Sequence, residues 1–180
     1  GDSRQIVLTP ASVQECADLT YLAFDLAEKY RTVVIILSDG GISQMIEKVV
    51  LPEAKEHDKD QFDWAIKGYK KLDEPKVKVT NLDRSMNYDD YDCMVQEKFR
   101  LMHENEQRWE EFMVEDAELV LVAYGISSRI CKSAVRRART QGLKLGLIRL
   151  ISAWPYPEKA FKNLPDSVKG LISVEMSLSA

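Results

Sequence analysis

The stretch from Glu118 to Arg149 constrains the fold most, because it reads as strand, turn, helix and strand without interruption. An apolar run at 119–124 is followed by a turn, a basic amphipathic segment at 127–140 and a second apolar run at 143–148. Continuous apolar runs are typical of strands buried on both faces of a parallel sheet, and the segment between them has helical periodicity. The sequence therefore predicts an α/β fold built from parallel-sheet modules.

The same pattern occurs once near the amino end of the chain. A short β-run at 4–8 precedes Ser12 and Glu15, which have the spacing of a capping box and predict a helix that ends near Tyr30. The β-branched run 32–37 is apolar on both faces, so we expect a strand buried in the sheet. A last strand is predicted at 170–175, after a short helix at 158–164.

The middle of the chain differs in composition from both ends. Residues 53–116 carry a net charge of −7, against −3 for 1–52 and +6 for 117–180. After Pro52 the sequence is charged and rich in turn residues, which predicts a linker, and an apolar stripe at helical spacing predicts a helix over 90–112. We expect this acidic connector to face the basic last third of the chain.

Composition excludes several classes of protein. With 45% hydrophobic and 30% charged residues and no apolar run near the roughly 20 residues of a membrane span, we expect a soluble cytoplasmic protein. The three cysteines and two histidines lack the spacing of metal ligands, so we expect small buried cysteines and no metal site held by this chain alone. No Gly-rich dinucleotide fingerprint and no P-loop is present.

Several short words, taken in order, go beyond this general pattern: Leu8-Thr-Pro-Ala-Ser-Val-Gln-Glu15, Ile36-Leu-Ser-Asp-Gly40, Gln44-Met-Ile-Glu-Lys-Val49, Val122-Ala-Tyr-Gly125, Gly146-Leu-Ile-Arg149, Trp154-Pro-Tyr-Pro157 and Val174-Glu-Met176. In this order and spacing the chain resembles the alpha subunit of 2-oxoacid:ferredoxin oxidoreductases, most closely the branched-chain 2-oxoisovalerate type. The resemblance extends over nearly the whole chain and is weakest in the connector.

The resemblance implies a thiamine-diphosphate enzyme of anaerobic metabolism that oxidatively decarboxylates a 2-oxoacid to an acyl-CoA and passes electrons to ferredoxin. Residues 1–52 would be the C-terminal part of a pyrimidine-binding domain, 53–115 an acidic connector with a helix, and 116–180 a truncated transketolase C-terminal-like domain. Thiamine diphosphate with its Mg would lie mostly on a separate beta subunit and the iron–sulfur clusters on beta and delta subunits. The partners of this chain would be the beta, gamma and delta subunits. No catalytic residue is expected in this fragment, which would be inactive alone.

Asp39, Gly40 and Gly41 follow the strand at 32–37 and are candidates for contact with thiamine diphosphate, because glycines let a backbone approach a ligand. The alternative interpretation is a strand-end turn in which Asp39 caps the following segment.

Gly125, Ser127, Ser128 and Arg129 are candidates for binding an anion or part of CoA, since helix-start amides, hydroxyls and a guanidinium would converge there. Alternatively, Ser127 or Ser128 caps the helix.

Four basic residues recur on one face of the predicted helix 127–140, and we place four apolar residues opposite to them. The basic residues are Arg129, Lys132, Arg136 and Arg139, the apolar ones Ile130, Ala134, Val135 and Ala138, and the expected acidic partners Glu104, Glu106, Glu110 and Glu111. No aromatic side chains interleave the basic ones and the chain is acidic, which argues against nucleic-acid binding. Two rival functions remain: a nucleotide- or CoA-binding α/β module, and a structural assembly domain without catalysis of its own.

Overall fold

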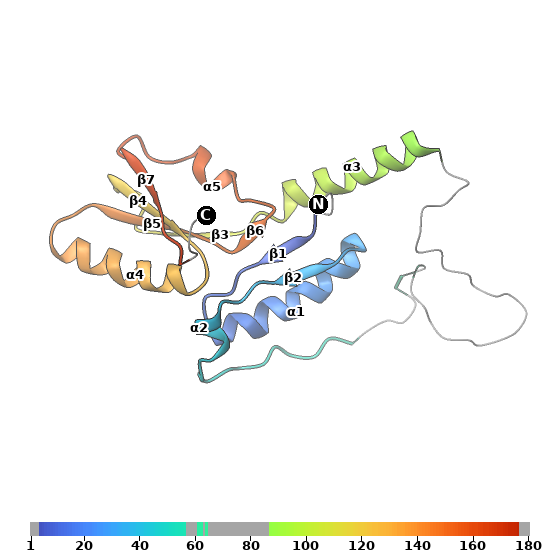
Figure 1. The fold of residues 1–180 in the computed structure, drawn as a ribbon, viewed down its shortest axis with the longest axis horizontal. Coiled ribbons are helices and arrows are strands. Elements are labelled where there is room, and N and C mark those ends of the chain that lie inside the picture. The colour runs from blue at the N-terminus through green and yellow to red at the C-terminus, as the bar shows by residue number, and fades with distance from the viewer. Residues whose placement is uncertain (1–3, 57–60, 63, 65–86, 177–180) are drawn as a thin grey trace, which may run out of the picture. The chain divides into compact units, whose positions relative to one another are not determined.

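The computed structural model describes residues 4–56, 61–62, 64 and 87–176 (Figure 1). The chain forms two units, one of residues 1–52 with 98–180 and one of residues 53–97. Most of the predicted linker lies outside the described residues. The contacts discussed below lie within the first unit.

Seven strands and five helices are defined in the described part of the chain. In order they are β1 (Ile6–Leu8), α1 (Val13–Tyr30), β2 (Val34–Ile36), α2 (Gly40–Ser43), α3 (Tyr88–Asn105), β3 (Trp109–Phe112), β4 (Leu119–Ala123), α4 (Gly125–Thr140), β5 (Leu145–Leu150), β6 (Ser152–Trp154), α5 (Lys159–Lys162) and β7 (Gly170–Ser173).

A four-stranded sheet with the order β3-β5-β4-β7 forms the larger module. Strand β4 is parallel to both β5 and β7, whereas β3 is antiparallel to β5. Alternate residues of β4 enter different cores: Leu121 packs with Cys131 and Val135 of α4, while Val120 packs with Ala160 of α5. Figure 1 shows α4 along one face of this sheet. The predicted α/β class is confirmed.

A three-stranded sheet with the order β2-β1-β6 forms the smaller module. Strands β1 and β2 are parallel, and Ile6 and Leu8 are fully buried in a core with Leu26 and Tyr30 of α1. Strand β6, from the later part of the chain, pairs antiparallel with β1.

The prediction that 32–37 is buried on both faces is wrong. Val33 is 58% exposed, Ile35 37% and Leu37 46%, whereas Val34 and Ile36 pack in the core with α1. The physical reason is that β2 is an edge strand and α1 covers one face of it.

The predicted capping box at the start of α1 is present with one difference. The Ser12 hydroxyl accepts a hydrogen bond from the amide of Glu15 at 3.2 Å, as expected. The Glu15 carboxylate, however, accepts from the amide of Ala11 at 2.8 Å rather than from that of Ser12. The helix ends at Tyr30, and the next residue, Arg31, adopts the left-handed conformation (φ 44°) that closes many helices.

The predicted helix 90–112 is wrong at its end, because α3 stops at Asn105 and residues 109–112 form β3. Trp109 pairs with Leu150 and Phe112 with Leu147 in the antiparallel ladder to β5. The apolar side chains continue at helical spacing through Trp109 and Phe112, but pairing with the distant strand β5 outweighs this local helical pattern. Among the described residues, no helix has the length and apolar character needed to cross a membrane.

Candidate functional site

The turn after β2 lies against the first turn of α4. Asp39 caps α2, with Oδ1 accepting from the amide of Ile42 at 2.9 Å, which is the cap that the alternative interpretation expected. Its Oδ2 accepts from the amide of Ile126 at 2.8 Å. One carboxylate therefore binds amides at the start of two helices, where the positive ends of the helix dipoles favour negative charge.

Two glycines make this close approach feasible. Gly125 has φ +55°, and a Cβ placed on it would lie 2.7 Å from Asp39 Oδ2. A Cβ on Gly41 would lie 3.1 Å from Asp39 Oδ1, whereas one on Gly40 would meet nothing within 4 Å. The space around Gly125 and Gly41 is thus taken by the Asp39 carboxylate.

The start of α4 differs from the expectation that Ser127 or Ser128 caps it. The helix begins at Gly125, its N-cap Tyr124 makes no side-chain cap bond, and both serines are buried. The Ser128 hydroxyl donates to the carbonyl of Gly125 at 2.7 Å. The capping group is Asp39, which comes from another element, so the pattern of residues near 127 does not reveal it.

Arg129 also has a partner within the chain. Its guanidinium lies 2.7 Å from the Glu47 carboxylate, which in turn accepts from the amide of Val13 at 3.2 Å. The hydrogen bond from Arg129, followed by that from the Val13 amide, lowers the pKa of Glu47 below its ordinary value. The ligand role of residues 125–129 stays a prediction, as does that of 39–41.

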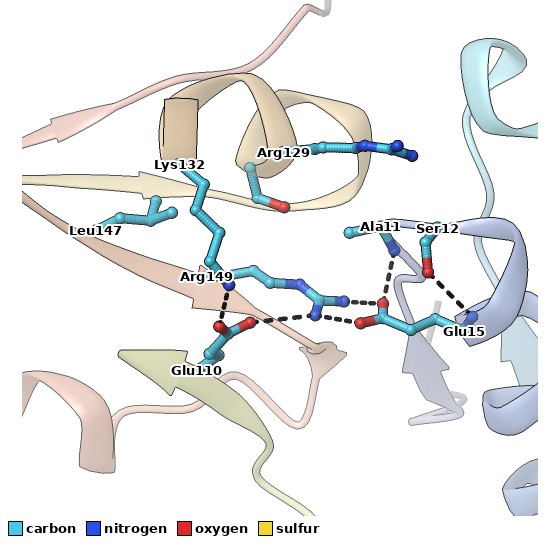
Figure 2. Close-up of a pocket in the computed structure, with 9 residues that line it drawn as sticks. Ala11, Ser12, Glu15, Glu110, Arg129, Lys132, Leu147 and Arg149 are labelled. Atoms are coloured by element: carbon cyan, nitrogen blue, oxygen red, sulfur yellow. Dashed lines mark hydrogen bonds and ion pairs between the residues drawn. The ribbon is translucent and has the colours of Figure 1, made fainter. Parts of the chain in front are cut away.

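A cavity of about 190 Å³ lies beneath the first turns of α4 (Figure 2). Helix α4 contributes Ser128, Arg129 and Lys132 to its lining, and β5 contributes Arg149 and Leu147. The remaining lining comes from Glu110 of β3 and from residues Ala11, Ser12 and Glu15 at the start of α1. The cavity therefore brings together both sheet modules of the first unit.

Arg149 crosses this cavity between two carboxylates. Its side chain is only 7% exposed, and it forms a two-pronged ion pair with Glu15, with Nη1 to Oε1 at 2.7 Å. Nη2 donates to the carbonyl of Thr9 at 3.2 Å, and Nη1 lies 3.6 Å from Glu110. Nε of Arg149 is buried and has no hydrogen-bond partner. The sequence named Arg149 as part of a family motif but did not predict this role, because its partners lie more than 130 residues away in the chain or on β3.

Lys132 completes the row of charges by pairing with Glu110. Burial raises the pKa of Glu110, but the hydrogen bond from Lys132 and the positive charges of Lys132 and Arg149 outweigh burial, so the pKa lies below its ordinary value. Figure 2 shows Lys132 and Glu110 on one side of the Arg149 guanidinium and Glu15 on the other.

The expected acidic partners of α4 are only partly correct. Glu110 does pair with Lys132, but Arg139 pairs with Asp116 and Arg129 with Glu47. The other three expected partners contact different groups: Glu104 pairs with Arg100, Glu106 with Lys29 and Arg108, and Glu111 accepts from Trp109.

The expected apolar face of α4 is shifted. Ile130 (58% exposed) and Ala134 face solvent rather than the core, while Cys131 and Val135 are buried. The prediction that the cysteines are buried is confirmed for Cys131 and wrong for Cys93, which is exposed. Among the residues that the structure describes, no group of three or more His, Cys, Asp or Glu side chains could hold a metal ion.

Two sequence models of one oxidoreductase family match the chain. The model described as pyruvate flavodoxin/ferredoxin oxidoreductase, thiamine diphosphate-binding, matches residues 2–114, which is more than half of the chain. The chain belongs to the pyruvate flavodoxin/ferredoxin oxidoreductase family. The model of pyruvate:ferredoxin oxidoreductase core domain II matches residues 117–180, so the family assignment extends over both sheet modules.

Archaeal relatives of this oxidoreductase family are similar along the whole chain. The ketoisovalerate oxidoreductase subunit VorB of Methanothermobacter marburgensis is 46% identical over 98% of the chain and 50% of the relative. The 2-oxoglutarate synthase subunit KorA of Methanocaldococcus jannaschii is 36% identical over 99% of the chain and 54% of the relative. The chain thus spans about half the length of these curated relatives.

A solved structure shares the fold. It is a 2-oxoglutarate:ferredoxin oxidoreductase from Magnetococcus marinus, with a TM-score of 0.70 and 19% identity over 99% of this chain and 36% of the other.

Proposed function

We propose that this chain is part of the alpha subunit of a thiamine-diphosphate-dependent 2-oxoacid:ferredoxin oxidoreductase. The reaction would be oxidative decarboxylation of 2-oxoisovalerate to an acyl-CoA, with electrons passed to ferredoxin. The observation that carries the proposal is the 46% identity to a ketoisovalerate oxidoreductase subunit over 98% of the chain, against 36% to a 2-oxoglutarate synthase subunit. The setting would be the cytoplasm.

We assign residues 1–52 to the C-terminal part of the pyrimidine-binding domain and 116–180 to a transketolase C-terminal-like domain, with 53–115 as connector. The division between the two family models after residue 114 supports the boundary near residue 116, whereas the first model runs through 2–114 without a break at residue 52. The exposed face of β2, with Val33, Ile35 and Leu37, is consistent with a smaller sheet that is covered by other polypeptide in the whole enzyme.

The described residues do not fit a thiamine diphosphate site of their own. The Asp39 carboxylate already accepts two backbone amides, and the turn 38–41 lines neither the cavity under α4 nor the apolar groove of about 490 Å³ beside β7. We therefore propose that the cofactor and its Mg lie on the beta subunit and the iron–sulfur clusters on the beta and delta subunits, and we assign no catalytic step to this chain.

The substrate is tested by assembling the complete alpha polypeptide with its partner subunits and measuring ferredoxin reduction with CoA and one 2-oxoacid at a time. We expect kcat/KM for 2-oxoisovalerate to exceed that for pyruvate and for 2-oxoglutarate by at least about tenfold. One methylene in an apolar pocket gives roughly 10–200-fold discrimination, and the second carboxylate of 2-oxoglutarate is costly to bury in such a pocket. Preference for 2-oxoglutarate, or no turnover of any 2-oxoacid by a complex loaded with cofactor, would contradict the proposal.

The two candidate sites are tested in the same complex by one variant each. Asp39→Asn should raise the thiamine diphosphate concentration needed for half-maximal activity if the turn contacts the cofactor, with Asp116→Asn as the control. Arg129→Ala should weaken CoA binding if Arg129 holds CoA, with Arg137→Ala, an exposed arginine of the same helix, as the control. Unchanged cofactor or CoA dependence would leave Asp39 and Arg129 with their structural roles alone.

A further inference from the structure

Residues 44–52, which follow α2, form neither helix nor strand, yet side chains of α1 and α4 hold them in place (Figure 1). The Gln14 side-chain amide donates to the Val50 carbonyl at 2.8 Å and accepts from the Val50 amide at 2.8 Å. Nearer to α2, the Glu47 carboxylate accepts from the Val13 amide and pairs with Arg129. Segment 44–52 is therefore fixed to two helices by polar contacts at two points.

Alternate residues of segment 44–52 face the protein and the solvent. Glu47 and Val49 are half-buried, whereas Ile46, Lys48 and Val50 are exposed. An extended chain places residues i, i+2 and i+4 on the same side. The three exposed side chains therefore form one row on the solvent side of the segment.

This row exposes more apolar surface than a solvated loop needs. Ile46 is 99% exposed, the highest value for a large apolar side chain in the described part of the chain, and Val50 (69%) and Leu51 (77%) follow within five residues. Single exposed apolar side chains are ordinary, whereas several together mark a surface that binds another molecule. Because the segment is already held in place, binding would cost it little conformational entropy.

Lys48 gives the exposed row its charge. The neighbouring Glu47 carboxylate pairs with Arg129, and none of the residues that the structure describes pairs with Lys48. Covering an ammonium group without a partner is unfavourable, so a surface that covers this row should present a carboxylate to it. The complementary surface is therefore an apolar patch with one Asp or Glu.

Two other occupants fit the row less well. Ile46 and Val50 lie symmetrically about Lys48, so a second copy paired antiparallel, apolar against apolar, would bring two Lys48 ammonium groups together, which is destabilising. A further part of the same polypeptide would place this lysine in the core of one chain, where lysine is rarely buried. Relatives of the chain are named as subunits, which supports a different polypeptide as the partner.

We propose that segment 44–52 docks on a partner subunit of the complete enzyme, at an apolar patch that carries an Asp or Glu opposite Lys48. Ile46, Val50 and Leu51 supply the apolar contact, and Lys48 supplies the ion pair that orients it. The inference rests on the proposed function for the existence of partner subunits, but not for the substrate or the reaction. Its tests measure association rather than turnover.

The first test places a photo-crosslinking amino acid, p-benzoylphenylalanine, at position 46 of the complete alpha polypeptide in a complex reconstituted from purified subunits. We expect irradiation to join position 46 to a partner subunit, at a peptide that contains Asp or Glu. The same amino acid at position 143 replaces Leu143, which is exposed beyond the opposite end of α4, and should give no product at that peptide. A product within the alpha polypeptide, a product between two alpha polypeptides, or none from an assembled complex would overturn the proposal.

The apolar contact is tested by the Kd between the complete alpha polypeptide and the crosslinked subunit, measured by analytical ultracentrifugation. Ile46→Gln combined with Leu51→Gln should raise this Kd at least about tenfold, as expected when large apolar side chains lose their burial. Leu143→Gln is the matched control and should leave the Kd unchanged. All three side chains are exposed, so the urea unfolding midpoint should stay that of the wild type, which separates loss of docking from loss of folding.

The ion pair is tested by charge reversal in the same assay. Lys48→Glu should raise the Kd roughly tenfold, by an amount that shrinks as sodium chloride is added, whereas Lys48→Arg should bind like the wild type. Lys144→Glu reverses an exposed charge beyond the opposite end of α4 and is the control.

The docking proposal is overturned if the Kd is unchanged by Lys48→Glu or by the double glutamine variant. Equal effects of Lys48→Glu and Lys144→Glu overturn it as well, because binding would then respond only to net charge. A wild-type complex that assembles but turns over no 2-oxoacid contradicts the proposed function and leaves these measurements of docking intact.

Discussion

Single carboxylates hold this structure at points where several elements meet. Glu106 is the clearest case: it is 2% exposed and accepts from Lys29 Nζ at 2.7 Å, Tyr30 Oη at 2.7 Å and Arg108 Nη2 at 2.9 Å. Burial raises the pKa of Glu106, but the hydrogen bonds from Lys29 and Tyr30 outweigh it, so the pKa lies below its ordinary value of 4.5. The ionised form of Glu106 therefore stabilises the fold.

Glu106→Gln should lower the free energy of unfolding at pH 7 by about 1.5–3 kcal/mol, the contribution of hydrogen bonds to a charged group. Because the pKa of folded Glu106 is depressed, its stabilisation is present above about pH 4.5 and is lost as the pH falls below that value through the folded pKa. Urea unfolding between pH 7 and pH 3 should show a smaller pH dependence in the variant. Glu104→Gln, an exposed i,i+4 partner of Arg100, should change stability by less than about 0.5 kcal/mol.

A side chain at position 125 is disfavoured both by the positive φ of Gly125 and by the nearby Asp39 carboxylate. Gly125→Ala should cost at least about 1 kcal/mol more than Gly142→Ala, because both have positive φ but only the Cβ at 125 meets Asp39. Thermal or urea unfolding of both variants measures the difference. If the Asp39 carboxylate is the cause, the excess cost should disappear in an Asp39→Ala background, and its persistence there would refute this explanation.

At the scale of elements, charged contacts join α1 to the larger sheet. Arg149 of β5 pairs with Glu15 of α1, and Glu47 binds both the first amide of α1 and Arg129 of α4. Thr9 adds a hydroxyl bond to the carbonyl of Leu150 at 2.9 Å. The contacts of Thr9 and Arg149 lie where the chain passes from β5 of the larger sheet to β6, which pairs with β1 of the smaller sheet. Strand pairing and ion pairs therefore support the same junction.

A double-mutant cycle with Arg149→Met and Glu15→Gln tests this junction. Breaking one side of a buried ion pair typically costs about 3–5 kcal/mol, and we expect a coupling energy of at least about 1 kcal/mol between the two positions. Urea unfolding of the four proteins gives the value. Additive effects would mean that each residue acts through Thr9, Ala11 or Glu110 instead.

At the scale of the whole chain, one apolar face of β2 is only partly covered by the described residues. Alternation along the strand places Val34 and Ile36 toward α1 and leaves Val33, Ile35 and Leu37 partly in water. A strand at a sheet edge with an apolar face favours association with other polypeptide.

We expect Val33→Thr combined with Leu37→Gln to reduce binding of a hydrophobic fluorescent dye to the isolated chain at least about twofold, with stability changed by about 0.5 kcal/mol or less, as is usual for surface substitutions. Ile130→Gln, which changes an exposed apolar residue on α4, is the control and should leave dye binding nearly unchanged. Equal effects of both changes would show that the face of β2 is not the binding surface.

The sequence by itself determined the α/β class, the two strand–helix–strand units and the family. Hydrophobic periodicity and short sequence motifs are local signals, because they depend only on residues that are close together in the sequence. Helix α1, for example, was predicted from Ser12 and Glu15 and from its apolar spacing, and the structure has it at Val13–Tyr30.

Only the tertiary structure decided the contacts between distant segments. The pairing of β3 with β5, the pairing of β6 with β1, the Asp39 cap on α4 and the Arg149–Glu15 pair all join residues far apart in the chain. Such pairings depend on which side chains the folded backbone brings within hydrogen-bonding distance, and no local spacing encodes that. The charge pattern of α4 shows the same limit: the sequence predicted the partner Glu110, but only the folded structure shows that Glu47 and Asp116 are the partners of Arg129 and Arg139.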